Sequence, residues 1–293
     1  MTSNAVTAPA LPANETKRNP VVSVVIHAIL IAAAILMLYP LLWMLSAAVR
    51  PSTEIFGSTS LWPSSINFDS FVRGWYGLSL PFGYFFMNSA TVAVLSVAGN
   101  VLSCSLAAFA FARLEFRGRR IWFALMLGTL MLPYHVVLIP QYILFLKLGW
   151  VNSFLPLVVP KFLASDAFFI FLMVQFFRGI PRELDEAAMM DGCSPWRIYW
   201  KIMMPLSVPV LTTAAIFSFI WTWDDFFGPL IYLNDIRTYT VQLGLRSFVD
   251  ATSDSDWGGL FAMSILSLVP VFAFFLIFQR LLIEGIATTG MKR

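Results

Sequence analysis

Six long apolar stretches dominate this chain, at about residues 21–48, 88–112, 121–146, 154–177, 206–233 and 260–284. Each is long enough to cross the ~30 Å hydrocarbon core of a bilayer as a helix. Backbone polar groups cannot stay unpaired in hydrocarbon, and the runs are continuous, whereas barrel strands alternate between apolar and polar residues. We therefore predict an all-α integral membrane protein with six transmembrane helices.

The composition agrees with a lipid bilayer as the environment. Only 12% of the 293 residues are charged, whereas a soluble domain has about a quarter. A net charge of +3 without a basic stripe argues against a nucleic-acid partner. The two histidines, His27 and His135, lie far apart and have no cysteine at ligand spacing, so no metal site is predicted. No nucleophile and base are clustered, so no catalytic residues are predicted either.

The ends of the chain differ from its apolar centre. Residues 1–20 are rich in Ala, Pro, Asn and Thr and are predicted to form a disordered tail. The apolar run at 21–48 is about twice as long as the core of a signal peptide, so we interpret it as a retained first helix. An external loop at 49–87, a core of five helices at 88–284 and a tail at 285–293 follow.

Charge asymmetry predicts the orientation. If the N-terminus is cytoplasmic, the inner segments hold 13 of the 19 Lys and Arg residues and the outer segments hold 6. Cytoplasmic loops carry the excess of positive charge. We therefore predict a multi-pass protein of the cytoplasmic (inner) membrane with both termini in the cytoplasm.

The predicted outer loop at about 234–259 is long and acidic. Its candidate contacts for an external partner are Asp250, Asp254, Asp256 and Trp257. The alternative is a solvated connection between two helices.

The segment between the fourth and fifth apolar stretches is predicted to form two short helices with a tight turn. Pro181 suits the first helical position, and Gly192 suits the left-handed residue that ends a helix. Ser194 can cap the second helix, and Pro205 interrupts that helix before the membrane is entered again. A structured knob of this kind needs a partner to dock against, unless it simply lies on the membrane surface.

One face of the first short helix is suited to docking. Leu184, Ala187, Ala188 and Asp191 are expected to share it at helical spacing. The two alanines allow close approach of another backbone, and Glu186 beside them can offer a carboxylate to an arginine of the partner.

This segment resembles the EAA motif of the permease subunits of ABC importers. The resemblance rests on Glu186-Ala187-Ala188, Gly192, Ile202 and Pro205 in register. Further similarity to the maltose-type sugar permeases lies in Asn88-Ser89, Leu106–Leu114, Phe116–Arg119, Gln279-Arg280 and Gly285–Lys292. The chain departs from the family at Cys193, Met204 and Asp224, where Ala, Leu and Asn are usual.

The resemblance implies the type I ABC importer permease fold and a coupling loop at 178–205. It implies coupling to an ATPase through Leu184, Glu186, Ala187, Ala188, Asp191, Gly192, Ile202 and Pro205. The chain has no phosphate-binding Gly-x-x-x-x-Gly-Lys-Ser/Thr loop. ATP and Mg²⁺ are therefore expected on two partner ATP-binding subunits, and the chain itself is not an enzyme. A second homologous permease subunit, an extracytoplasmic solute-binding protein and a sugar or polyol substrate complete the implied system.

Polar and aromatic residues within the apolar stretches are candidates for the substrate pathway. They are Asn88, Asn100, Gln141, Gln175, Ser218, Trp221, Trp223 and Asp224. Small polar residues in membrane helices more often hold helices together, and tryptophans often mark the membrane interface.

Three other functions compete with sugar import. A secondary carrier needs ionisable residues at mid-membrane, and mid-helix acids are nearly absent. A membrane-embedded enzyme needs the reactive cluster that this sequence lacks. An ABC permease for glycerol phosphate, an amino acid or a peptide is the remaining alternative.

Overall fold

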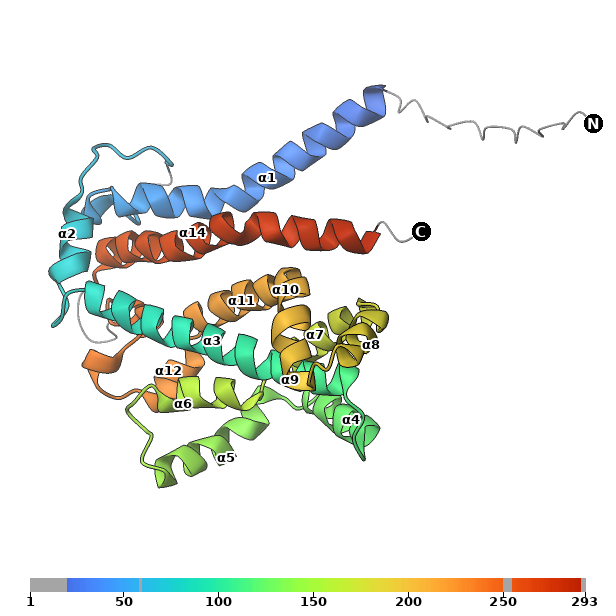
Figure 1. Cartoon of the computed structure of the whole chain (residues 1–293). Coiled ribbons are helices and arrows are strands. Elements are labelled where there is room, and N and C mark those ends of the chain that lie inside the picture. Colours follow the sequence, from blue (N-terminus) through green and yellow to red (C-terminus); the bar gives the residue numbers. More distant parts are fainter. Residues whose placement is uncertain (1–19, 58–59, 250–254, 291–293) are drawn as a thin grey trace, which may run out of the picture. The chain divides into compact units, whose positions relative to one another are not determined.

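The computed structural model in Figure 1 describes residues 20–57, 60–249 and 255–290. This part of the chain is helical and contains no strand. It divides into two units, one up to Met44 and the other from Leu45 onward, and each is described by itself. The first unit consists of the long apolar helix α1, Pro20–Ala48, whose last four residues belong to the second unit. The helix coincides with the apolar stretch at 21–48, whereas residues 1–19 of the expected tail lie outside the described residues.

The second unit contains the remaining elements. They are η1 (Ser52–Glu54), α2 (Asp69–Tyr76), α3 (Gly83–Arg113), α4 (Arg119–Thr129), α5 (Tyr134–Lys147), α6 (Leu155–Val158), η2 (Val159–Leu163), α7 (Ala167–Gly179), α8 (Glu183–Met190), α9 (Pro195–Ile198), η3 (Tyr199–Met203), α10 (Met204–Leu206), α11 (Val208–Trp223), α12 (Phe227–Tyr232), η4 (Ile236–Thr238), α13 (Val241–Arg246) and α14 (Trp257–Gly290).

The described residues contain fewer candidate membrane spans than the six that were predicted. Four segments are long and apolar enough to cross a membrane, and the bent pair of 195–206 with 208–223 gives a fifth if it is counted as one span. The predicted stretch at 121–146 is instead two helices, α4 and α5, separated at 130–133. Pro133 explains this break, because proline lacks an N–H group and disfavours helical geometry in the residue before it.

Two other boundaries differ from expectation. The expected loop at 49–87 contains α2 and the first turn of α3. The segment expected to form a tail from residue 285 continues α14 as far as Gly290.

Helix α3 is the centre of the second unit. It packs against α7, α11 and η2, while α11 packs against α14 and α14 against α2. The approach of η2 is close: a Cβ atom on Gly99 would lie 2.8 Å from the ring of Phe162 and 3.0 Å from the backbone of Lys161. A glycine is therefore required at this point of α3.

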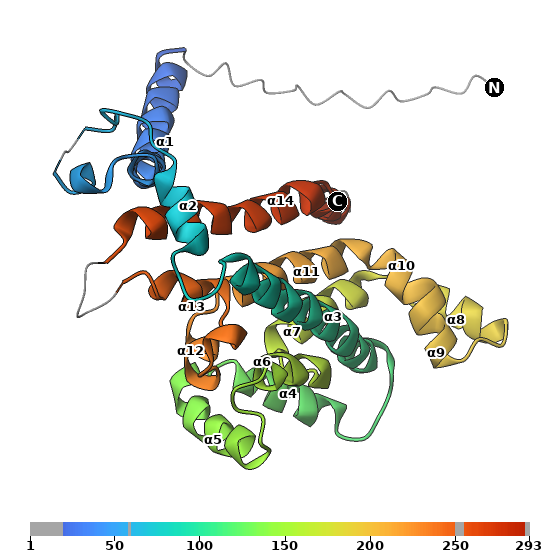
Figure 2. The same cartoon turned by 90° about the vertical axis from the view of Figure 1, so that its left-hand side faces the viewer.

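Two apolar clusters bury the two ends of α3. One joins Phe109 of α3 to Phe177 of α7 and Tyr199 of η3. The other joins Phe85 of α3 to Val241 of α13. Figures 1 and 2 both show α8 and α9 near the end of α3 that belongs to the first cluster. These two short helices therefore lie beside one end of α3, the central helix of this unit.

Candidate functional site

The helical hairpin α8–α9 has the local geometry that the sequence predicted. Gly192 has φ of 76°, the left-handed conformation that ends α8. The backbone N–H of Arg197 donates to Ser194 Oγ at 3.4 Å, which caps α9. The backbone N–H of Cys193 also donates to the Ala188 carbonyl at 2.9 Å and closes the turn. The hairpin is therefore an ordered element.

The exposed face of α8 differs from the predicted one at one position. Glu186 and Ala187 are exposed, and Met190 is 89% exposed. Ala188, however, is buried in the apolar cluster, so it does not belong to the same accessible surface as Ala187. The buried side of α8 consists of Asp185 and Ala188, which lie three residues apart. The prediction of a shared docking face was wrong for Ala188, because that alanine is needed for packing against the bundle.

A buried ion pair attaches α8 to the end of α3. Arg113 Nε lies 3.2 Å from Asp185 Oδ2, and the two side chains are 5% and 12% exposed. Arg113 Nη2 also donates to the Ile180 carbonyl at 2.7 Å, which fixes the connection between α7 and α8. Removing one partner of a buried pair leaves an uncompensated charge, so such a contact holds its elements firmly together.

The second half of the hairpin is attached to the same helix. The hydroxyl groups of Tyr199 and Ser105 lie 2.7 Å apart, and both residues are fully buried. The Tyr199 ring also packs on Phe109 with a centroid distance of 5.4 Å. Both halves of the hairpin therefore contact α3, one through Arg113 and the other through Ser105.

Neither Asp185 nor Arg113 was predicted from the sequence as a site residue. A signal was present, because Asp185 is an acid three residues before Ala188 on the inner side of α8. Its partner was not identifiable without the fold, since Arg113 lies more than 70 residues earlier in the chain.

The end of the second short helix is irregular. Residues Tyr199–Met203 form a π-helical turn, and α10 and α11 then meet at a bend of 77°. Pro205 lacks the N–H group that would donate to the Lys201 carbonyl, so a regular α-helix cannot pass through this position. The half-buried Ile202 packs against the apolar cluster from the π-helical turn, whereas Pro205 is exposed.

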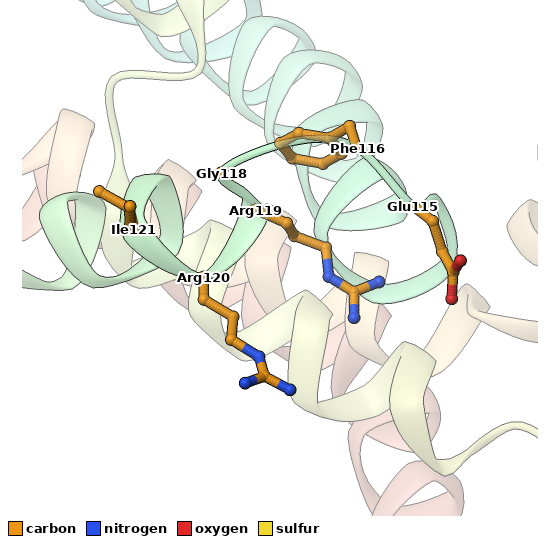
Figure 3. Close-up of a pocket in the computed structure, with 6 residues that line it drawn as sticks. All are labelled: Glu115, Phe116, Gly118, Arg119, Arg120 and Ile121. Atoms are coloured by element: carbon orange, nitrogen blue, oxygen red, sulfur yellow. The ribbon is translucent and has the colours of Figure 1, made fainter.

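A surface hollow of about 410 Å³ lies at the turn between α3 and α4. Figure 3 shows the guanidinium groups of Arg119 and Arg120 there, with the Glu115 carboxylate on the α3 side. Arg119 Nη1 donates to the Leu114 carbonyl at 2.8 Å. The turn therefore adds positive charge close to Arg113.

The structure gives several substrate-pathway candidates a packing role. Asn100 Nδ2 donates to Ser218 Oγ at 2.9 Å, and both residues are at most 1% exposed, so they join α3 to α11. Asn88 Nδ2 donates to the carbonyls of Arg237 and Tyr239 at 2.8 and 2.9 Å. These residues hold elements together, as small polar groups in membrane proteins commonly do.

The other candidates lie in different surroundings. Trp223 is 3% exposed and donates from Nε1 to the Ser267 carbonyl at 3.1 Å, which makes it a core residue. Gln175 is exposed on α7, and Asp224 is exposed after α11. Trp221 lines a small cavity together with Asp225. Gln141 lines a larger one, to which Asp225 also belongs.

The predicted partner contacts of the outer loop are only partly described. Asp250 and Asp254 lie outside the described residues. Asp256 Oδ1 accepts from the Gly259 N–H at 3.0 Å, and Asp256 Oδ2 lies 3.6 Å from Arg73 Nε. The Trp257 ring meets Phe56 edge-on at 5.4 Å. Asp256 and Trp257 therefore both have contacts within the chain at the start of α14.

A comparison with known protein families decides the class of the chain. Residues 99–287 match the family described as the inner membrane component of binding-protein-dependent transport systems. The chain belongs to this family. The match begins near the middle of α3 and continues through the α8–α9 hairpin into α14.

Individual relatives of this transport family cover nearly the same length. The chain is 36% identical over 87% of its length to the probable ABC transporter permease protein YurM of Bacillus subtilis, and it covers 83% of that protein. It is 32% identical over 94% of its length to the arabinooligosaccharides transport permease AraQ of Halalkalibacterium halodurans, and covers 99% of it. It is 31% identical over 89% of its length to the trehalose/maltose transport permease MalG of Thermococcus litoralis, and covers 94% of it.

A solved structure confirms the fold of this family member. The chain matches a chain in the crystal structure of a bacterial ABC transporter involved in the import of the acidic polysaccharide alginate, with a TM-score of 0.80 and 23% identity. The match covers 93% of this chain and 99% of the other. The predicted type I ABC importer permease fold is therefore confirmed.

Gly192 offers a test of the hairpin turn. A Cβ atom at this position would meet no atom within 4 Å, so only the positive φ opposes a side chain. We expect Gly192→Ala to destabilise the hairpin by about 1 kcal/mol. Gly192→Asn should cost less, because asparagine tolerates this conformation better. The measurement is thermal unfolding of the purified protein; equal losses in the two variants would contradict this explanation.

Proposed function

We propose that this chain is the membrane-spanning permease subunit of an ABC importer for a sugar or a related polyol. Membership of the binding-protein-dependent transport family supports the import role. Relatives named for arabinooligosaccharide and trehalose/maltose transport support the sugar class. The chain supplies the pathway through the bilayer, and the energy for transport comes from separate ATPase subunits.

One observation carries the coupling role that we assign to the α8–α9 hairpin. The hairpin is bound to α3 through the buried Arg113–Asp185 pair, yet it leaves Glu186, Ala187 and Met190 exposed. An exposed apolar and acidic face on a firmly attached helix is suited to receive force from another protein. In this proposal the ATPase binds that face, and α8 passes the movement to α3.

Helix α3 links the two ends of the bundle. Besides its contacts with the hairpin, its Ser89 Oγ accepts from the Val241 N–H at 2.8 Å near its other end. ATP binding and hydrolysis on the partner subunits shift the bundle between two arrangements, one open to each side of the membrane. The ATP and its Mg²⁺ are held by those subunits.

The proposed assembly contains this chain, a second homologous permease, two ATP-binding subunits and an extracytoplasmic solute-binding protein. It lies in the cytoplasmic membrane, with both termini and the α8–α9 hairpin on the cytoplasmic side. The excess of Lys and Arg in the segments assigned to that side supports this orientation.

Purification tests the assembly. A tagged copy of the chain, extracted from its host in mild detergent, is expected to bring the ATPase subunits and the second permease with it. The same cells should take up a sugar in a manner that depends on ATP and on the binding protein. The proposed function would be contradicted if the chain were recovered without any of these subunits and if cells lacking the chain still showed normal ATP-driven sugar uptake.

A further inference from the structure

A cavity of about 650 Å³ lies among polar residues of the bundle. Its lining includes Gln141, Lys161, Asp166, Phe168, Asp225 and Tyr232. These residues come from α5, η2, α7, α12 and the connections between them. A cavity of this size is in the range of small-molecule sites, which combine apolar and aromatic walls with a few polar groups.

Three predicted spans are interrupted around this cavity. The break between α4 and α5 falls at 130–133, that between η2 and α7 at 164–166, and that between α11 and α12 at 224–226. Each break contributes lining residues, among them Asp166 and Asp225. Irregular backbone at membrane depth is tolerated where it is buried in protein or lines a cavity, and interrupted helices surround substrate sites in transporters.

The charges in the cavity favour a ligand rich in hydroxyl groups. Lys161 Nζ pairs with Asp166 Oδ2 at 2.9 Å, and each side chain is 30% exposed. Asp225 Oδ1 accepts the Gly228 N–H at 3.1 Å and keeps further acceptor capacity. The lining thus holds two carboxylates and one cation that is already paired. Carboxylates accept hydrogen bonds from hydroxyl groups but repel an anion.

We propose that this cavity is a saccharide site on this chain, which binds neutral sugars through Asp166 and Asp225 and rejects sugars that carry carboxylates. The proposal rests on the proposed function and adds a substrate class to it. Phe168 and Tyr232 supply the aromatic walls, and Gln141 lies in the same lining, where a cysteine can report on access to the cavity.

Thiol labelling at Gln141 tests whether the cavity is open to water and negatively charged. The experiment uses Gln141→Cys in the complete importer in lipid nanodiscs, with Cys193 replaced by alanine; Cys104 is buried. We expect a cationic methanethiosulfonate reagent to react about tenfold faster than an anionic one, because a cleft lined by one sign of charge concentrates its counter-ion. Adding Asp225→Asn should reduce that ratio severalfold. Gln175→Cys, which is exposed on α7 outside the cavity, is the matched control and should show no such dependence on Asp225.

Protection by sugars tests the ligand class. The probes are maltose, arabinobiose and diacetylchitobiose as neutral sugars, and digalacturonate as an anionic one. At least one neutral sugar should slow labelling of Gln141→Cys severalfold, whereas digalacturonate should not. Protection by digalacturonate, protection by none of the probes, or no entry of the reagent because lipid or a partner chain fills the cavity would overturn the proposal.

Uptake by the same preparation separates this proposal from the proposed function. ATP-driven uptake of any of the four sugars without protection at Gln141→Cys overturns the cavity site alone. If no uptake depends on the ATPase subunits, the proposed function fails, whatever the labelling shows.

Discussion

Replacing Glu186 with lysine is expected to abolish transport while the protein remains in the membrane. Glu186 is exposed on α8, outside the apolar cluster, so its side chain contributes little to folding. It lies in the first turn of α8, where losing an acid costs about 0.3–1 kcal/mol. A reversed charge facing a cation of the ATPase would cost several kcal/mol at the interface, which corresponds to at least about a hundredfold loss of uptake.

Three measurements are needed for Glu186→Lys: substrate uptake, abundance in the membrane and co-purification of the ATPase. Glu115→Lys is the matched control, because it makes the same charge change on an exposed residue near the same end of α3. We expect that variant to keep most of its uptake. Glu186→Gln should give an intermediate loss, because it removes the attraction without adding repulsion. Normal uptake by Glu186→Lys would mean that α8 is not the coupling helix.

The hairpin was predictable from the sequence because local rules determine it. Gly192 and Ser194 act within one turn of the residues they influence, so their roles follow from residue type and spacing alone. The long apolar runs predicted the spanning helices for the same reason. Pro133 shows the limit of this approach. Its stretch was predicted as one span, although the proline divides it into α4 and α5.

The contacts between distant segments were not predictable. The polarity of Asn100 and Ser218 made them candidates for the substrate pathway, but only the fold shows that they bind each other between α3 and α11. Asp224 was chosen for the pathway, whereas its neighbour Asp225 lines both cavities. In an irregular connection, neighbouring side chains can point in different directions. No periodicity exists there to indicate which of the two acids points inward.

The Arg113–Asp185 pair carries the second large expected effect. Asp185→Asn keeps the size of the side chain and removes its charge, which leaves Arg113 buried with the Ile180 carbonyl as its hydrogen-bond acceptor. Breaking a buried pair on one side costs about 3–5 kcal/mol. We therefore expect the purified importer to unfold at a clearly lower temperature. ATP hydrolysis should also become less dependent on the binding protein, since the ion pair between α8 and α3 is lost.

A double variant separates the charge from the contact. Replacing both partners, Arg113→Met with Asp185→Leu, removes both charges and fills the space with apolar groups. Such replacements are often neutral for stability, so the double variant should unfold within about 1 kcal/mol of the original protein.

The exposed pair of Arg73 and Asp256 is the control for this prediction. Its side chains are 45% and 33% exposed, and its atoms lie 3.6 Å apart. Arg73→Gln should therefore cost less than about 1 kcal/mol, because solvent screens the pair. If Asp185→Asn costs no more than Arg73→Gln, or if the effects of Arg113→Met and Asp185→Leu, each measured alone, simply add in the double variant, the pair does not hold α8 on α3. Transmission from the hairpin would then have to pass through Tyr199 and Ser105, the other contact between the hairpin and that helix.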